Sequence, residues 1–331
     1  MGLFGRWRKD AAGGARVAGR GLETTPALDP AFGDPLLRSV IAQAGARDWP
    51  ALRQSLRGAA DQVEQTTLLT AAAEVGGVEE WVPQAIAADA GDPLPLLLSG
   101  ARQVMWAWEA RTGARARNVT RDQWDVFLER LSVAEEQLLE VAEREPTWLA
   151  PWYFLQMSAR GASLDKDVAR YRFEAALRRA PEHPASHRQR LQQVCEKWGG
   201  SHAEMHAFAR ESMLAAAPGS PLGELVARAH LERWLDLGGG TQGRAYMSGP
   251  NVMAELQEAA QRSVFHPEYR AERTWKGVHN TFAMAFSLSG QRHLARPLFE
   301  ALDGTVTQTP WAYLGGDPAL SFRTHRARCA A

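Results

Sequence analysis

Two histidines four residues apart, His202 and His206, are the first side chains whose spacing suggests chemistry. Residues at this spacing share one face of a helix, and two imidazoles placed in this way can bind a metal ion. In the helical zinc-protease motif a glutamate directly follows the first histidine, whereas here Glu204 lies two residues after it. Ser201 and Glu204 have the spacing of a capping box at a helix start. We therefore interpret this stretch as a helix start and predict no metal ligands.

Other catalytic patterns are missing from the sequence. The glycine-rich run Gly238–Gly243 lacks the Gly-Lys-Ser/Thr ending of a phosphate-binding loop, and no Gly-x-Ser-x-Gly elbow occurs. Cys195 lies on an apolar helical pattern, which favours a small core residue. We accordingly predict no catalytic residue and no cofactor.

A set of possible ligand-binding residues remains. Lys197, Trp198, His202 and His206 all lie around the Gly199-Gly200 turn, and Trp275 is a further candidate among the 12 tryptophans. Most tryptophans are expected in the core, but tryptophan is also favoured in the centre of binding surfaces. The prediction for a binding site is therefore Lys197, Trp198, His202, His206 and Trp275.

The elements that would position these residues are helices. The Gly199-Gly200 turn separates a helix through Leu191 and Val194 from one that runs from Ser201 to about Ala217. Helices end at Pro146, Pro181 and Pro218, which are 35 and 37 residues apart, and a second proline soon follows each of them. Proline after a helix stops it, and proline in the next first turn starts another. A period near 34 residues with two helices per unit is the signature of tetratricopeptide repeats.

Two resemblances follow from these residues. The segment 173–185 resembles the second helix and exit turn of a tetratricopeptide repeat. The stretch Lys-Trp-Gly-Gly-Ser at 197–201, followed by Met205, Phe208 and Ala209-Arg210, is similar to a helix joint in an uncharacterised bacterial family; the Arg-Asp-Trp-x-x-Leu segment at 47–52 is also similar. The resemblances imply an all-α, tetratricopeptide-like superhelix of helical hairpins with one continuous core. They imply no activity.

Composition narrows the class of protein. The 331 residues carry 38 acidic and 38 basic side chains, so no overall field favours nucleic acid. Two cysteines form no disulfide framework, which fits a reducing cytoplasm, and the predominance of arginine over lysine suggests a bacterial source. No apolar run is long enough for a membrane span. The basic segment 1–20 could contact an anionic membrane surface, although its glycines favour a disordered tail.

The expected organisation is a disordered basic tail over residues 1–32, a helical repeat domain over 33–320 and a flexible basic tail over 321–331. A glycine-rich loop is expected from Gly238 to about Pro250. The natural use of such an array is to bind a protein or peptide segment on its concave face, as a non-catalytic intracellular scaffold or adaptor. The alternative is an enzyme or small-molecule sensor with a site near Lys197–His206.

Overall fold

The computed structural model describes residues 25–111 and 119–330, so the predicted membrane contact of residues 1–20 and most of the predicted disordered tail over 1–32 lie outside these ranges. Residues 25–32 of that tail are described, and Ala31 among them is buried. The described chain is mostly helical with almost no strand, so the prediction of an all-α fold is confirmed. Two strands of two residues each are the exception: β1 (Ala27–Leu28) pairs in parallel with β2 (Thr305–Val306). None of the described helices is both long and apolar enough to cross a bilayer.

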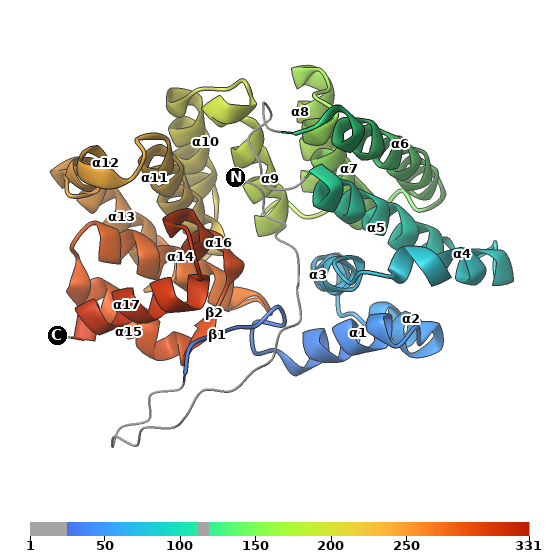
Figure 1. Cartoon of the computed structure of the whole chain (residues 1–331), viewed down its shortest axis with the longest axis horizontal. Helices are drawn as coiled ribbons and strands as arrows, with labels where there is room; N and C mark the ends of the chain where they lie inside the picture. The colour runs from blue at the N-terminus through green and yellow to red at the C-terminus, as the bar shows by residue number, and fades with distance from the viewer. Residues whose placement is uncertain (1–24, 112–118, 331) are drawn as a thin grey trace.

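The first half of the chain forms eight helices, shown in blue to green in Figure 1. They are α1 (Pro35–Gly45), α2 (Trp49–Arg57), α3 (Gln62–Ala73), α4 (Val78–Ala88), α5 (Pro93–Arg111), α6 (Arg121–Arg144), α7 (Ala150–Gly161) and α8 (Lys166–Leu177). Side chains cap several of their starts: Asp48 accepts a hydrogen bond from the Ala51 amide at 3.1 Å, and Thr120 forms a reciprocal capping box with Gln123. Successive helices such as α5 and α6, or α7 and α8, pack together as hairpins.

The second half follows α9 (Pro184–Gln193), which lies between the two groups of helices in Figure 1. Its elements are η2 (Glu196–Trp198), α10 (His202–Ala215), η3 (Pro221–Gly223), α11 (Glu224–Asp236), α12 (Gly240–Met247), α13 (Pro250–Arg262), α14 (Trp275–Leu288), α15 (Arg292–Leu302), α16 (Gln308–Trp311), η4 (Ala312–Leu314) and α17 (Pro318–Ala330). Here α10 packs on α11, and α14 on α15.

The joint between α9 and α10 is a tight turn, as its glycines predicted. Gly199 has a φ of +86°, a conformation that costs little only for glycine. A Cβ atom on Gly200 would lie 2.0 Å from the carbonyl oxygen of Val194, so only glycine fits there. The Glu204 amide donates to Ser201 Oγ at 3.1 Å, which confirms Ser201 as the cap of α10.

The apolar core is divided into two clusters, which corrects the expectation of one continuous core. Buried residues between 31 and 157 form one cluster, and those between 191 and 329 form the other. Trp198 packs against both clusters. The division follows from the space between the two groups of helices, which is a cavity lined by both polar and apolar groups.

Contacts far apart in the sequence join the two halves at their ends. The β1–β2 pairing aligns Ala27 with Thr305 (Figure 1). Arg273 donates to Asp34 Oδ2 at 2.9 Å and also pairs with Glu64. These contacts hold the start of the described chain against its last third.

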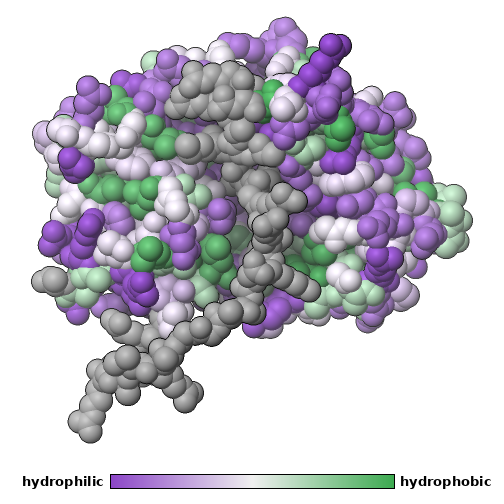
Figure 2. Space-filling view, viewed as in Figure 1, coloured by the Kyte–Doolittle hydropathy of each residue, from purple (hydrophilic) through white to green (hydrophobic). Residues whose placement is uncertain are grey.

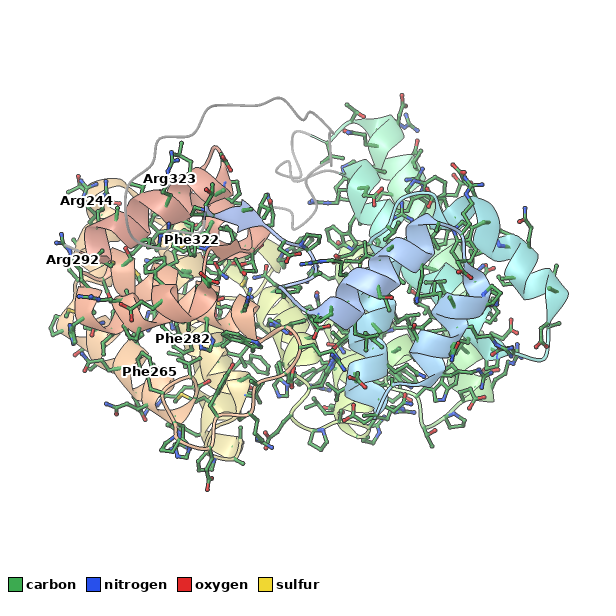
Figure 3. All side chains as sticks on the ribbon, turned by 90° about the horizontal axis from the view of Figure 1, so that it is seen from below. Arg244, Phe265, Phe282, Arg292, Phe322 and Arg323 are labelled. Atoms are coloured by element: carbon green, nitrogen blue, oxygen red, sulfur yellow. The ribbon has the colours of Figure 1, made fainter. Side chains whose placement is uncertain are left out.

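Two expectations about irregular segments need correction. Within the expected loop at Gly238–Pro250, residues 240–247 form the helix α12. Gly243 in this helix packs closely on the Trp234 indole, because a Cβ atom on Gly243 would lie 2.8 Å from Cδ1 of Trp234. Within the expected flexible tail, α17 runs to Ala330 and buries Phe322 and Cys329. Figure 3 shows Phe322 directed inward and Arg323 outward from this helix. Packing against α14 and α15 orders a segment whose composition is basic.

Candidate functional site

The five predicted binding residues do not converge on one site. Lys197 Nζ donates to Glu232 Oε2 at 2.7 Å, and that carboxylate is buried. Trp275 lies on α14, where its ring makes an edge contact with His279 at 4.6 Å between centroids. The remaining three residues lie near the α9–α10 joint and have separate partners, described next.

His202 and His206 face different groups, although they share one helix. His202 Nε2 lies 2.7 Å from Glu196 Oε2 and 3.1 Å from Asp236 Oδ2, near the surface. The His206 ring lies 4.8 Å from the His230 ring between centroids. The pair therefore does not face a common metal position.

Trp198 is held between two arginines and a second tryptophan. The guanidinium carbons of Arg111 and Arg160 lie 5.2 and 5.5 Å from its ring centroid, and Trp108 makes an edge contact at 5.8 Å. Burial lowers the pKa of Arg160 to about 10, and its guanidinium donates to Gln189 Oε1 at 2.6 Å. These cation–π contacts bridge the two core clusters. A small cavity of about 190 Å³ lies beside Trp198, but Lys197, His202 and His206 do not line it.

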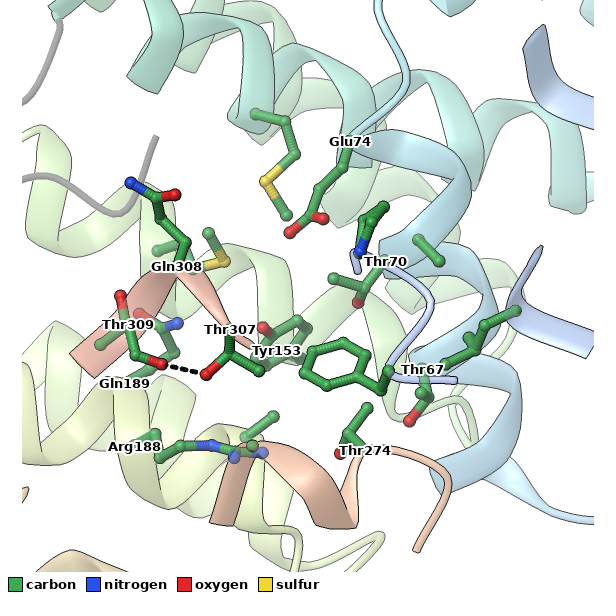
Figure 4. Close-up of a pocket in the computed structure, with 18 of the residues that line it drawn as sticks. Thr67, Thr70, Glu74, Tyr153, Arg188, Gln189, Thr274, Thr307, Gln308 and Thr309 are labelled. Carbon is green, nitrogen blue, oxygen red and sulfur yellow. Dashed lines mark hydrogen bonds between the residues drawn. The ribbon is translucent and has the colours of Figure 1, made fainter. Parts of the chain in front are cut away.

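The larger cavity, of about 1300 Å³, lies between the two halves of the molecule. Figure 4 shows Thr67, Thr70 and Glu74 on one side, with Arg188, Gln189 and the 307–309 segment across from them. Polar groups from distant parts of the sequence line it, including Thr66, Thr67, Thr70, Glu74, Glu109, Arg130, His183, Arg188, Gln189, Gln192, Arg228, Glu272, Thr274, Thr307, Gln308 and Thr309. Apolar side chains such as Phe32, Met105 and Met157 lie among them.

Glu74 is the unusual carboxyl of this cavity. It directly follows α3, where the helix dipole disfavours a negative charge. Its side chain is exposed to the water-accessible space of the cavity, so its desolvation comes from the cavity walls around it rather than from exclusion of water. Burial, followed by repulsion from Glu109, raises the pKa of Glu74 to about 7. Among the described residues its carboxylate has no hydrogen-bond or ion-pair partner.

The neighbouring charges, in contrast, are mostly paired. Glu109 accepts from Arg102 at 2.8 Å. Glu224, a buried residue, accepts from Arg188 at 3.2 Å and from Arg228 at 2.7 Å, while the Thr281 hydroxyl donates to it at 2.7 Å. These partners outweigh desolvation and lower the pKa of Glu224. Across the cavity, burial raises the pKa of Glu272. The pKa values of Glu74 and Glu272 are therefore both raised, although Glu74 is exposed to the cavity and Glu272 is half-buried.

Burial leaves the cavity histidine neutral. His183 has its pKa lowered to about 3 by desolvation and by the nearby charge of Arg188. Its Nδ1 lies 2.8 Å from Ser186 Oγ. This histidine therefore contributes a polar surface rather than a positive charge.

Sequence reasoning missed this cavity because its residues come from elements far apart in the chain. Glu74 stands before Gly76-Gly77 and has the pattern of an ordinary helix end. Comparison of the chain with protein-family models, with curated proteins and with solved structures finds no match in any of the three.

Proposed function

We propose that this chain is a non-catalytic binding protein with a tetratricopeptide-like fold. Its central cavity would take up an extended segment of a protein or peptide that carries a lysine or arginine side chain. The observation that carries the proposal is Glu74, a carboxyl with no counter-ion that faces the cavity. A cationic side chain placed beside it would supply the missing partner and stabilise its charged form.

The size and lining of the cavity support a peptide ligand. Small-molecule sites usually enclose about 300–1,000 Å³, and this cavity, at about 1300 Å³, is larger. Threonine hydroxyls and glutamine amides are spread over opposite walls, where they can hydrogen-bond to a peptide backbone (Figure 4). Among the described residues, the outer surface offers no comparable binding site on its visible face. The exposed large apolar side chains are few, and Figure 2 shows mixed polarity over that face.

The alternative function, an enzyme or small-molecule sensor at Lys197–His206, has weaker support. The charged groups there already pair within the fold, as Lys197 does with Glu232 and His202 with Glu196 and Asp236. The nearby cavity of about 190 Å³ is small for a ligand.

A library of short random peptides displayed on phage tests the proposal. We expect the intact protein to enrich sequences with a lysine or arginine, and Glu74→Gln to weaken binding of those peptides by tenfold or more. The control, Glu80→Gln, removes an exposed carboxylate that pairs with Arg47 and should leave binding unchanged. Affinity should also rise between about pH 6 and pH 8 as Glu74 ionises. Peptides that bind equally well to the Glu74→Gln protein would refute the cavity as the binding site.

A further inference from the structure

A second cluster of polar groups lies in the C-terminal half, away from the central cavity. Helices α10, α11 and α13 bring together His206, His230 and Glu255. Each offers one possible ligand atom, and these atoms all lie within 4.8 Å of one another. No two of the three residues are near in sequence, so the arrangement arises from helix packing.

We propose that His206, His230 and Glu255 form a binding site for a divalent transition-metal ion, with Zn²⁺ as the best match. Two imidazole nitrogens and one carboxylate are a ligand set that zinc accepts readily. Three protein ligands leave a fourth position of a tetrahedral site for water. This inference is independent of the proposed peptide-binding function.

The distances fit a shared ion. His230 Nε2 lies 3.0 Å from Glu255 Oε2. Two ligand atoms that each stand about 2.0–2.1 Å from a zinc ion are separated by about 3.0–3.4 Å at octahedral to tetrahedral angles. An ion could therefore insert between these two groups with small side-chain movements. His206 would complete the set from the adjacent turn of α10.

The protonation of the histidines also suits metal binding. Burial is the main cause that lowers the pKa of both His206 and His230 to about 4, and for His206 the neighbouring His230 adds to the effect. Both rings are thus neutral near pH 7, as metal ligation requires.

Tyr246 would act as an outer partner of the site. Its hydroxyl lies 2.7 Å from His230 Nδ1 and 3.4 Å from His206 Nε2. Without an ion, His230 Nε2–H donates to Glu255, and Nδ1 accepts from the tyrosine hydroxyl. With an ion on Nε2, the ring proton moves to Nδ1 and donates to Tyr246, the usual way in which a metal-bound histidine is oriented. The same side chains thus satisfy one another with or without metal.

A neighbouring cluster provides the matched control. Glu196, His202 and Asp236 also lie within 4.8 Å of one another. However, Glu196 and Asp236 are exposed, and Arg233 donates to Asp236 Oδ2 at 3.2 Å, which places a competing positive charge there. The cluster that contains the buried His230 and the half-buried His206 should therefore be the preferred site.

Calorimetric titration of Zn²⁺ into the chelator-treated full chain tests the inference, with Co²⁺ absorption as a second readout of tetrahedral coordination. We expect one tight equivalent per chain. His206→Ala and Glu255→Gln should each weaken binding by about 100-fold or more, and Tyr246→Phe by about 10–100-fold, as loss of an outer partner does. Circular dichroism would verify that each variant is folded. His202→Ala should bind like the parent protein.

Two results would overturn the inference. One is the absence of saturable Zn²⁺ binding by the intact chain. The other is binding that survives in folded His206→Ala and Glu255→Gln proteins, whether or not His202→Ala abolishes it.

Discussion

Replacing Glu74 by glutamine should stabilise the protein, and more so as the pH rises. The carboxyl has its pKa raised from an ordinary value of 4.5 to about 7. The folded state therefore binds this proton more tightly than the unfolded state does. Stability is lost as the pH rises from about 4.5 through 7, because the folded state must then carry an unpaired charge within the cavity, repelled by Glu109. Glutamine has the same shape and carries no charge.

The magnitude follows from the pKa. A change from 4.5 to about 7 corresponds to about 3 kcal/mol at 1.36 kcal/mol per pH unit. The carboxyl faces the water-accessible space of the cavity, so solvent screening reduces this upper limit, and we expect a gain of about 1–2 kcal/mol at pH 8. Near pH 4.5, where the carboxyl is protonated in the folded state and about half protonated in the unfolded state, the gain should fall to well under about 1 kcal/mol.

Urea unfolding at several pH values measures this effect directly. The parent protein, Glu74→Gln and the surface control Glu80→Gln would be compared between about pH 4.5 and pH 8. The difference between Glu74→Gln and the parent should grow with pH, and the control should show no such trend. A Glu74→Gln protein that is less stable than the parent at pH 8 would show that the carboxylate is well solvated or paired, and would refute the reasoning.

Three further variants test how the fold is held together. Glu224→Ala leaves Arg188 and Arg228 without their buried partner and should lower the free energy of unfolding by about 3–5 kcal/mol. Its control, Glu258→Ala, breaks an exposed pair with Arg210 and should lower that free energy by less than about 1 kcal/mol in the same denaturant assay. Gly200→Ala forces a Cβ onto the Val194 carbonyl and should lower the melting temperature clearly, while Gly76→Ala, with open space around it, should change it little. Arg273→Ala removes the ion pairs with Asp34 and Glu64. It should speed hydrogen exchange of the Ala27 and Asp29 amides, which donate to the carbonyls of Gly304 and Val306. Unchanged exchange would mean that the β1–β2 pairing does not depend on Arg273.

Local features of the fold could be predicted because they depend on neighbouring residues. Asp48 and Thr120 each cap a helix by accepting from the amide three residues ahead, and the Gly199-Gly200 turn follows from the conformational freedom of glycine. The helix end at Leu177 and the helix start at Pro184 also agree with the proline pattern. Each of these signals lies within a few residues of its effect.

Features that depend on packing between distant helices could not be predicted. The sequence placed His202 and His206 on one helix, but the positions of α11, α12 and α13 decided that His202 faces Asp236 and that His206 faces His230 and Tyr246. The cavity had no sequence signal, because its lining comes from residues that are separated along nearly the whole chain.

The amino-acid sequence by itself determined that this chain is helical, where many of its helices begin and end, and which faces of them are apolar. Only the tertiary structure decided that the core divides in two, that a cavity lies between the halves, and that Glu74 faces it without a counter-ion. The physical reason is the range of the forces. Caps, turns and helical periodicity act within one or two helical turns, whereas desolvation and charge pairing depend on every atom that packing brings nearby.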